Sequence, residues 1–143
     1  MSKGNTFEND LLKMIFNADA IANICDNAGG SPLTNLYLSL HTAGTNLEAG
    51  NQTTDEVAYT SYARKAVARS NVGFTVSTNS VVLAANQDFP ACTGLTATAT
   101  HFAIGTASTS TGKILYHGTV TPNISISTGV TPRLTTGTTI TED

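Results

Sequence analysis

The sequence has no tryptophan, only two cysteines and few charged side chains. Charged residues make up 12% of its 143 residues, about half the roughly 25% of an ordinary soluble domain. The cysteines, Cys25 and Cys92, lie far apart and form no CxxC pair. Their spacing therefore indicates neither a metal site nor a disulfide framework, and we expect buried free thiols. The net charge is −3 and the seven basic residues are scattered, which argues against a nucleic acid partner because no basic stripe follows a phosphate backbone.

Long apolar runs are also missing. No stretch approaches the roughly 20 apolar residues of a membrane-spanning helix. The polar opening, residues 1–5, lacks the apolar centre of a signal peptide. We therefore expect no membrane partner and a protein that is made and kept in the cytoplasm until something releases it.

Hydroxyl side chains replace the missing charges. The chain contains 25 threonines and 11 serines, and the β-branched threonine suits a pleated strand. Few charges also mean weak repulsion between crowded copies, which favours an oligomer or a lattice. The length fits one domain of roughly 100 to 200 residues, so we predict a single domain over residues 1–143.

An amphipathic helix is expected near the N-terminus. From Phe7 to Asn27 the apolar residues recur largely at three- and four-residue intervals. Gly29, Gly30 and Pro32 supply a stop after it. Asn17 and Asp19 permit a break into two shorter helices.

The period then changes from helical to alternating. Leu36, Leu38 and Leu40 point one way and Tyr37, Ser39 and His41 the other, which predicts a strand. The segment Thr42 to Asp55 is rich in Gly, Asn and Thr, so we predict a long surface loop. The further predicted strands are Ala63 to Arg69, Gly73 to Ser77, Ser80 to Ala84, Leu95 to Ile104, Lys113 to Val120, Ile124 to Ser127 and Leu134 to Thr141.

This order of elements predicts a mainly β protein. One N-terminal helical segment (1–30) followed by many short strands (31–143) favours an antiparallel β-sandwich or jelly roll. An immunoglobulin-like sandwich is the alternative fold, but this sequence lacks the tryptophan and the cysteine pair that are typical of immunoglobulin domains.

No pattern of catalytic or ligand residues stands out. His41, His101 and His117 are the only side chains that titrate near neutrality, and none has metal-ligand spacing to another candidate. No GxSxG is present, and abundant Ser and Thr make chance triads uninformative. We therefore expect no enzyme activity, no metal and no cofactor.

Glycoside cleavage requires a pair of carboxylates. Asp55 and Glu56 with Asp88 are the available carboxylates. Adjacent acidic residues in a loop are usually only solvated, so a hydrolase is disfavoured.

Candidate interface residues come from three places. The basic cluster around Arg64 suits either a carboxylate on a partner chain or protection of a strand edge against unwanted pairing. Tyrosines beside arginine are common interface anchors and common core residues, and core is favoured for Tyr62. The helix offers an apolar face. The candidate interface residues are Phe7, Leu11, Tyr59, Arg64, Lys65 and Arg69.

The chain resembles a family of small phage and prophage proteins labelled tail fibre proteins, some of whose look-alikes are capsid decoration or cement proteins. The resemblance spans nearly the whole chain and carries no catalytic residue. It rests on Ser2 to Asn9, Leu36 to Ala43, Tyr62 to Arg64, Val67 to Ser70, His101 to Gly105, Gly129 to Pro132 and Thr141 to Asp143.

The resemblance implies a structural virion protein that is assembled in the host cytoplasm. The expectation is a capsid decoration protein that binds the major capsid protein or other virion proteins and stabilises the assembled head. A homo-oligomer is expected, with a trimer preferred and a dimer possible. The alternative is a tail fibre or tail-tip protein that binds a host receptor through an exposed loop.

Overall fold

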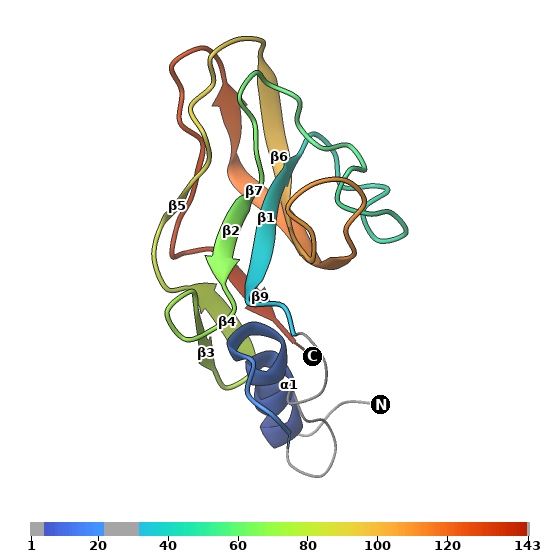
Figure 1. Ribbon diagram of the computed structural model, residues 1–143, viewed down its shortest axis with the longest axis vertical. Coiled ribbons are helices and arrows are strands. Elements are labelled where there is room, and N and C mark those ends of the chain that lie inside the picture. Colours follow the sequence, from blue (N-terminus) through green and yellow to red (C-terminus); the bar gives the residue numbers. More distant parts are fainter. Residues whose placement is uncertain (1–4, 22–31, 143) are drawn as a thin grey trace. The chain divides into compact units, whose positions relative to one another are not determined.

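A computed structural model describes residues 5–21 and 32–142 of the chain (Figure 1). Within these residues it contains one helix and nine strands, and every pair of strands whose register is resolved is antiparallel. The mainly β architecture with an N-terminal helix is therefore confirmed. The elements are α1 (Asn5–Asn17), β1 (Asn35–His41), β2 (Lys65–Ala68), β3 (Phe74–Ser77), β4 (Ser80–Leu83), β5 (Gln87–Asp88), β6 (Ala97–Gly105), β7 (Ile114–Ile126), β8 (Arg133–Leu134) and β9 (Thr139–Thr141).

The chain divides into two compact units, each with its own contacts. In the described residues, the first unit holds α1, β3, β4 and β9, and the second holds most of β1, β6 and β7 with the loops between them. The strands form three sheets, in the orders β2-β1-β6-β7, β3-β4-β9 and β5-β8. The single domain, and the sandwich or jelly-roll arrangement of the sheets, stay predictions.

The first unit is built by α1 packing against the β3–β4 hairpin (Figure 1). Leu12 and Phe16 on α1 are fully buried, as the helical spacing predicts. The rings of Phe16 and Phe74 meet edge to face, with centroids 4.9 Å apart. Val81 and Leu83 of β4 complete this apolar contact.

The helix is shorter than the predicted span, because it ends at Asn17. Ala18 follows in the left-handed conformation, with φ of 62°, and the N–H of Asp19 donates to the carbonyl of Lys13 at 3.2 Å. A left-handed residue after the last turn is a common helix terminator. The helix therefore ends where Asn17 and Asp19 permit a break, and residues 18–21 are not helical. The second short helix of that prediction falls on residues 22–27, which lie outside the described residues.

The strand predictions hold with three changes. The predicted strands at 113–120 and 124–127 are one strand, β7, whose register against β6 shifts between Ala99 and His101. The predicted strand at 134–141 is two strands, β8 and β9, with a turn from Thr135 to Thr138 between them. The short strand β5 was not predicted, since two residues carry no period.

Strand β1 is central in its sheet and is covered on both faces. Leu36, Leu38 and Leu40 are buried as the alternation predicts. Ser39 and His41 on the opposite face are also fully buried, so this polar face is not a solvent face. Such burial requires hydrogen-bond partners for each polar atom.

Replacing Ala18 with glycine is expected to stabilise the protein. Glycine adopts a positive φ without the steric cost of a Cβ atom, so Ala18→Gly should raise the free energy of unfolding by about 1 kcal/mol. Urea denaturation measures the change. The matched control is Ala20→Gly, two residues on and without a positive φ, which should not stabilise; equal effects in both variants would contradict this account of the helix end.

Candidate functional site

The segment Thr42 to Asp55 is a closed loop pinned at its ends and centre. The N–H of Thr42 donates to the carbonyl of Asp55 at 2.8 Å, and three turns, each closed by a backbone hydrogen bond, lie inside the loop. Leu47 and Gln52 point inward and are fully buried. A loop whose ends meet and whose own side chains fill it is an Ω-loop. The predicted surface loop is therefore confirmed, but it is anchored by buried groups.

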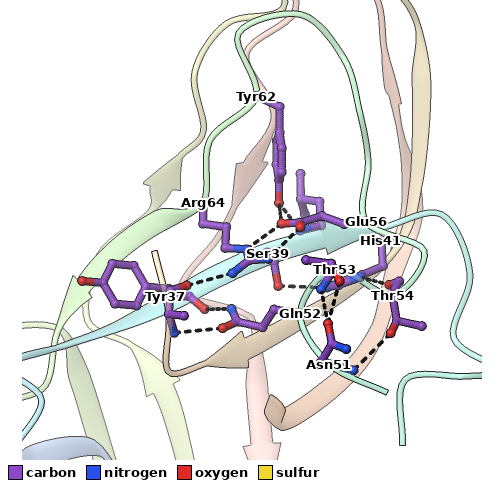
Figure 2. Close-up of polar contacts among 12 residues, drawn as sticks. Tyr37, Ser39, His41, Asn51, Gln52, Thr53, Thr54, Glu56, Tyr62 and Arg64 are labelled. Atoms are coloured by element: carbon purple, nitrogen blue, oxygen red, sulfur yellow. Dashed lines mark hydrogen bonds and ion pairs between the residues drawn. The ribbon is translucent and has the colours of Figure 1, made fainter. Parts of the chain in front are cut away.

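The first anchor is His41, at the end of β1. Its Nδ1 lies 2.8 Å from the carbonyl oxygen of Thr54, so Nδ1 carries a proton and donates it to the loop (Figure 2). Nε2, 2.8 Å from the Ser39 hydroxyl, then accepts a hydrogen bond from it. Burial lowers the pKa of His41. A neutral imidazole thus joins β1 to the loop.

The second anchor is the ion pair of Glu56 with Arg64. The guanidinium is bidentate: Nε lies 2.8 Å from Oε1 and Nη2 lies 2.8 Å from Oε2. The two side chains are only 15% and 3% exposed. Arg64 Nη1 also donates to the carbonyl of Ala107 at 3.0 Å. A two-pronged contact fixes direction as well as distance, so the guanidinium joins the residue after the Ω-loop to the loop that follows β6.

Tyr62 completes the environment of this carboxylate. Its hydroxyl donates to Glu56 Oε1 at 2.8 Å and accepts the N–H of Leu40 at 3.1 Å. Burial, and next the charge of Glu56, raise the pKa of Tyr62 well above its usual range. Tyr59 packs edge to face on Tyr62 and donates to the carbonyl of Pro90 at 2.8 Å. Burial raises the pKa of Tyr59 to about 12. Both phenols therefore act as hydrogen-bond donors inside the unit.

The third anchor is Gln52, whose side chain is shared between three segments. Nε2 donates to the carbonyl of Tyr37 on β1 at 3.2 Å, and Oε1 accepts the N–H of Ala107 at 3.0 Å (Figure 2). Its backbone N–H donates to the carbonyl of Gly112 at 2.9 Å. A Cβ atom at Gly105 would lie 2.2 Å from the Gln52 side chain, and one at Gly112 would lie 2.1 Å from it. Glycine is needed at both positions because the amide passes directly over them.

These anchors join two loops into one surface. We call the exposed residues of the Ω-loop and of segment 106–113 the paired-loop surface. They are mostly hydroxyl and amide side chains, with few charges. Because the backbone beneath is fixed by buried bonds, the surface is ordered before it meets a partner, which lowers the entropy cost of binding. Its exposed residues are Thr42, Thr45, Asn46, Glu48, Ala49, Gly50, Thr53, Ser108, Thr109, Ser110, Thr111 and Lys113.

Of the predicted interface residues, three in this region have different surroundings. Tyr59 is 3% exposed, and Arg64 is occupied by Glu56. Lys65 is partly exposed at the start of β2. The alternative of Tyr62 as a core residue agrees with its part-buried hydrogen bonds.

The other three predicted interface residues lie in the first unit. Phe7 is 40% exposed on α1, and Leu11 is partly exposed. Arg69 donates to the carbonyls of Met14 and Ile15, the latter at 2.6 Å, near the C-terminal end of α1. A cation there complements the helix dipole. An interface role for the six predicted residues stays a prediction.

The carboxylates considered for hydrolysis have partners of their own. Glu56 is bound by Arg64, and Asp88 forms an exposed bidentate pair with Arg133 at 2.5 and 2.8 Å. Asn46 donates to Asp55 at 3.5 Å. In residues 5–21 and 32–142, no three His, Cys, Asp or Glu side chains cluster as metal ligands.

The remaining candidates are simple to place. His101 lies beside His41 across the β1–β6 pairing, with its Nδ1 2.8 Å from the hydroxyl of Thr100, and His117 is exposed on β7. The prediction of a buried free thiol is confirmed for Cys92. Cys25 lies outside the described residues.

Sequence reasoning missed Ser39, Gln52 and the pairing of Glu56 with Arg64. Alternation placed Ser39 opposite the leucines without showing whether that face is buried, and a lone glutamine in a polar loop gives no signal. One signal was available at His41. A histidine that ends an apolar strand directly before a long loop is well placed to hold that loop.

The fold and its buried anchors define a mainly β structural module organised to present a fixed surface. The family model described as Podophage GP4 fiber I protein gp80 matches residues 2–142. The chain therefore belongs to this family and is a fibre-type structural component of a bacteriophage virion. No curated protein matches the chain. None of the helices in the described residues is long and apolar enough to span a membrane.

Breaking the buried ion pair is expected to be costly. Arg64→Ala leaves a carboxylate with 15% exposure and no cation, so it should lower the free energy of unfolding by about 3–5 kcal/mol in urea denaturation. The exposed pair of Asp88 and Arg133 is the matched control. Arg133→Ala should cost far less because solvent screens that pair; equal losses would show that the buried pair has no special role.

The stability of the protein should fall on mild acidification because of His41. Above the unfolded pKa of about 6.5 the imidazole is neutral in both states. Below that value the unfolded chain takes up a proton that folded His41 resists, so stability falls until the folded pKa is reached. Urea denaturation from pH 7.5 to 5 measures the slope. His41→Asn keeps a donor towards Thr54 and cannot titrate, so its slope should be smaller; an unchanged slope would refute the assignment.

Proposed function

We propose that the protein is a structural subunit of a podophage tail fibre and acts by binding alone. The observation that carries the proposal is the paired-loop surface, held by the buried pair of Glu56 and Arg64 within a fibre family. The polar groups best suited to chemistry are occupied in holding loops: Ser39 and His41 have no exposed surface. Catalysis by this cluster would need an accessible nucleophile.

The partners that fit this surface are other proteins of the virion or a host receptor. Hydroxyl and amide groups on a fixed backbone suit a polar, hydrogen-bonding interface. Few charges on the chain also suit closely packed copies, so a homo-oligomer, with a trimer preferred, is part of the proposal. The description of the family names a fibre protein, which supports the fibre role. No separate observation supports the capsid decoration role.

Cryo-electron microscopy of the intact phage tests the location. Density for this chain is expected at the tail, in a small number of copies, and absent from particles of a matched amber mutant. Hundreds of copies on the capsid lattice would overturn the fibre proposal and establish decoration.

A surface variant tests the contact region in the same particles. Thr109→Arg places a bulky charge on the paired-loop surface and should reduce incorporation or adsorption while leaving the unfolding midpoint unchanged. Thr136→Arg, exposed in the first unit, is the control and should assemble and adsorb normally. If both variants behave alike, the paired-loop surface is not the contact region.

A further inference from the structure

The first unit contains a cavity, open to solvent, whose described lining residues carry polar side chains. Its volume is about 470 Å³. It lies where the first turns of α1 meet the tight turn between β3 and β4. The described residues that line it are Thr6, Glu8, Asn9, Thr78 and Asn79.

Glu8 is the notable member of this lining. It is only 7% exposed, yet within the described part of the chain its carboxylate has no ion pair and no hydrogen bond. Its oxygen atoms are not among the fully buried polar atoms that lack a partner in the described part of the chain, so the carboxylate keeps contact with solvent. The N-terminal turn of α1 favours an anion, but with a partial charge of only about half a unit. The cavity therefore presents a carboxylate that a cation can approach.

Two amide side chains also line the cavity. Asn9 Nδ2 donates to the carbonyl of Thr78 at 2.7 Å, and Asn79 Nδ2 donates to the carbonyl of Glu142 at 3.1 Å. These bonds orient both amides, because only the nitrogen can donate to a carbonyl. Each Oδ1 is left as an acceptor on its side chain. One carboxylate and two amide oxygens match a group with one positive charge and several donors.

We propose that this cavity receives the side-chain ammonium of a lysine from a neighbouring chain of the virion. A lysine ammonium carries one charge and three donors on a flexible apolar stem, and the cavity is large enough for the stem. A divalent cation fits less well, since it is usually held by several carboxylates or many oxygens. The inference rests on the proposed virion role only for the source of the lysine.

Binding of lysine compounds to the full chain in solution tests the proposal. The probe is N-acetyl-lysine-N-methylamide, and N-acetyl-norleucine-N-methylamide is its uncharged control. Amide NMR signals of residues 6–9 and 78–79 should shift and saturate with a Kd on the order of millimolar for the lysine compound. Equal shifts with the norleucine compound, or no saturation with either, would overturn the proposal.

Protein variants identify the charge responsible. Glu8→Gln should weaken binding at least about tenfold, because a charge-assisted contact becomes a neutral one. Thr6→Asp adds a carboxylate to the lining and should tighten binding, which keeps the test decisive if Glu8→Gln folds poorly. Glu48→Gln removes one exposed charge from the other unit and should change nothing. Unchanged binding in the first two variants would overturn the proposal.

Two further outcomes separate this inference from the fibre role. If Ca²⁺ saturates the same signals at lower concentration than the lysine compound, the cavity is a metal site and the proposal is wrong. If lysine binding holds but the chain is found on the capsid, the fibre role fails and the lysine pocket stands with a different neighbour.

Discussion

The second unit depends on the burial of one carboxylate and one guanidinium. Glu56 and Arg64 lose their water on folding, and this desolvation costs free energy. The cost is offset by two parallel hydrogen bonds between the two side chains and by further bonds to Tyr62 and Ala107. Those extra bonds reach strand β1, through the N–H of Leu40, and the loop after β6, while Glu56 itself directly follows the Ω-loop. Since no member can be satisfied alone, the three segments are fixed together.

This arrangement explains how so weakly charged a protein specifies its loops. Only 12% of the residues are charged, so few side chains are available for charged surface networks, and hydroxyl side chains alone seldom fix a backbone. The order is supplied by buried groups: His41 and Arg64 donate to backbone carbonyls of the loops, and Gln52 of the Ω-loop donates to the carbonyl of Tyr37 on β1. A fibre protein of this family thus combines a polar, nearly neutral exterior with a few strongly directional groups inside.

Local periodicity carried most of what the sequence could predict. The alternation at Leu36 to His41 and the helical spacing from Phe7 fixed β1 and α1, because each pattern reports one buried face. The pattern does not show when both faces of a strand are buried, so the burial of Ser39 and His41 could not be predicted from it. The partners of Arg64 depend on contacts distant in sequence, and no local period reports those. The helix end depends on the left-handed backbone conformation of Ala18, and an alanine in a sequence does not indicate that conformation.

The glycines that contact Gln52 cannot be substituted without a clash, whereas the residues at the loop tips can be substituted. Gly105 and Gly112 have no room for a side chain, and the residues that hold the loops have no substitute of the same geometry. The tips, such as Thr45 and Ser108, meet only solvent and can be replaced at little cost to folding. Substitutions at the loop tips alone can therefore change the exposed surface of the protein without affecting its fold. Sequence variation among related fibre proteins should be concentrated at these tips, while the buried residues that hold the loops stay constant.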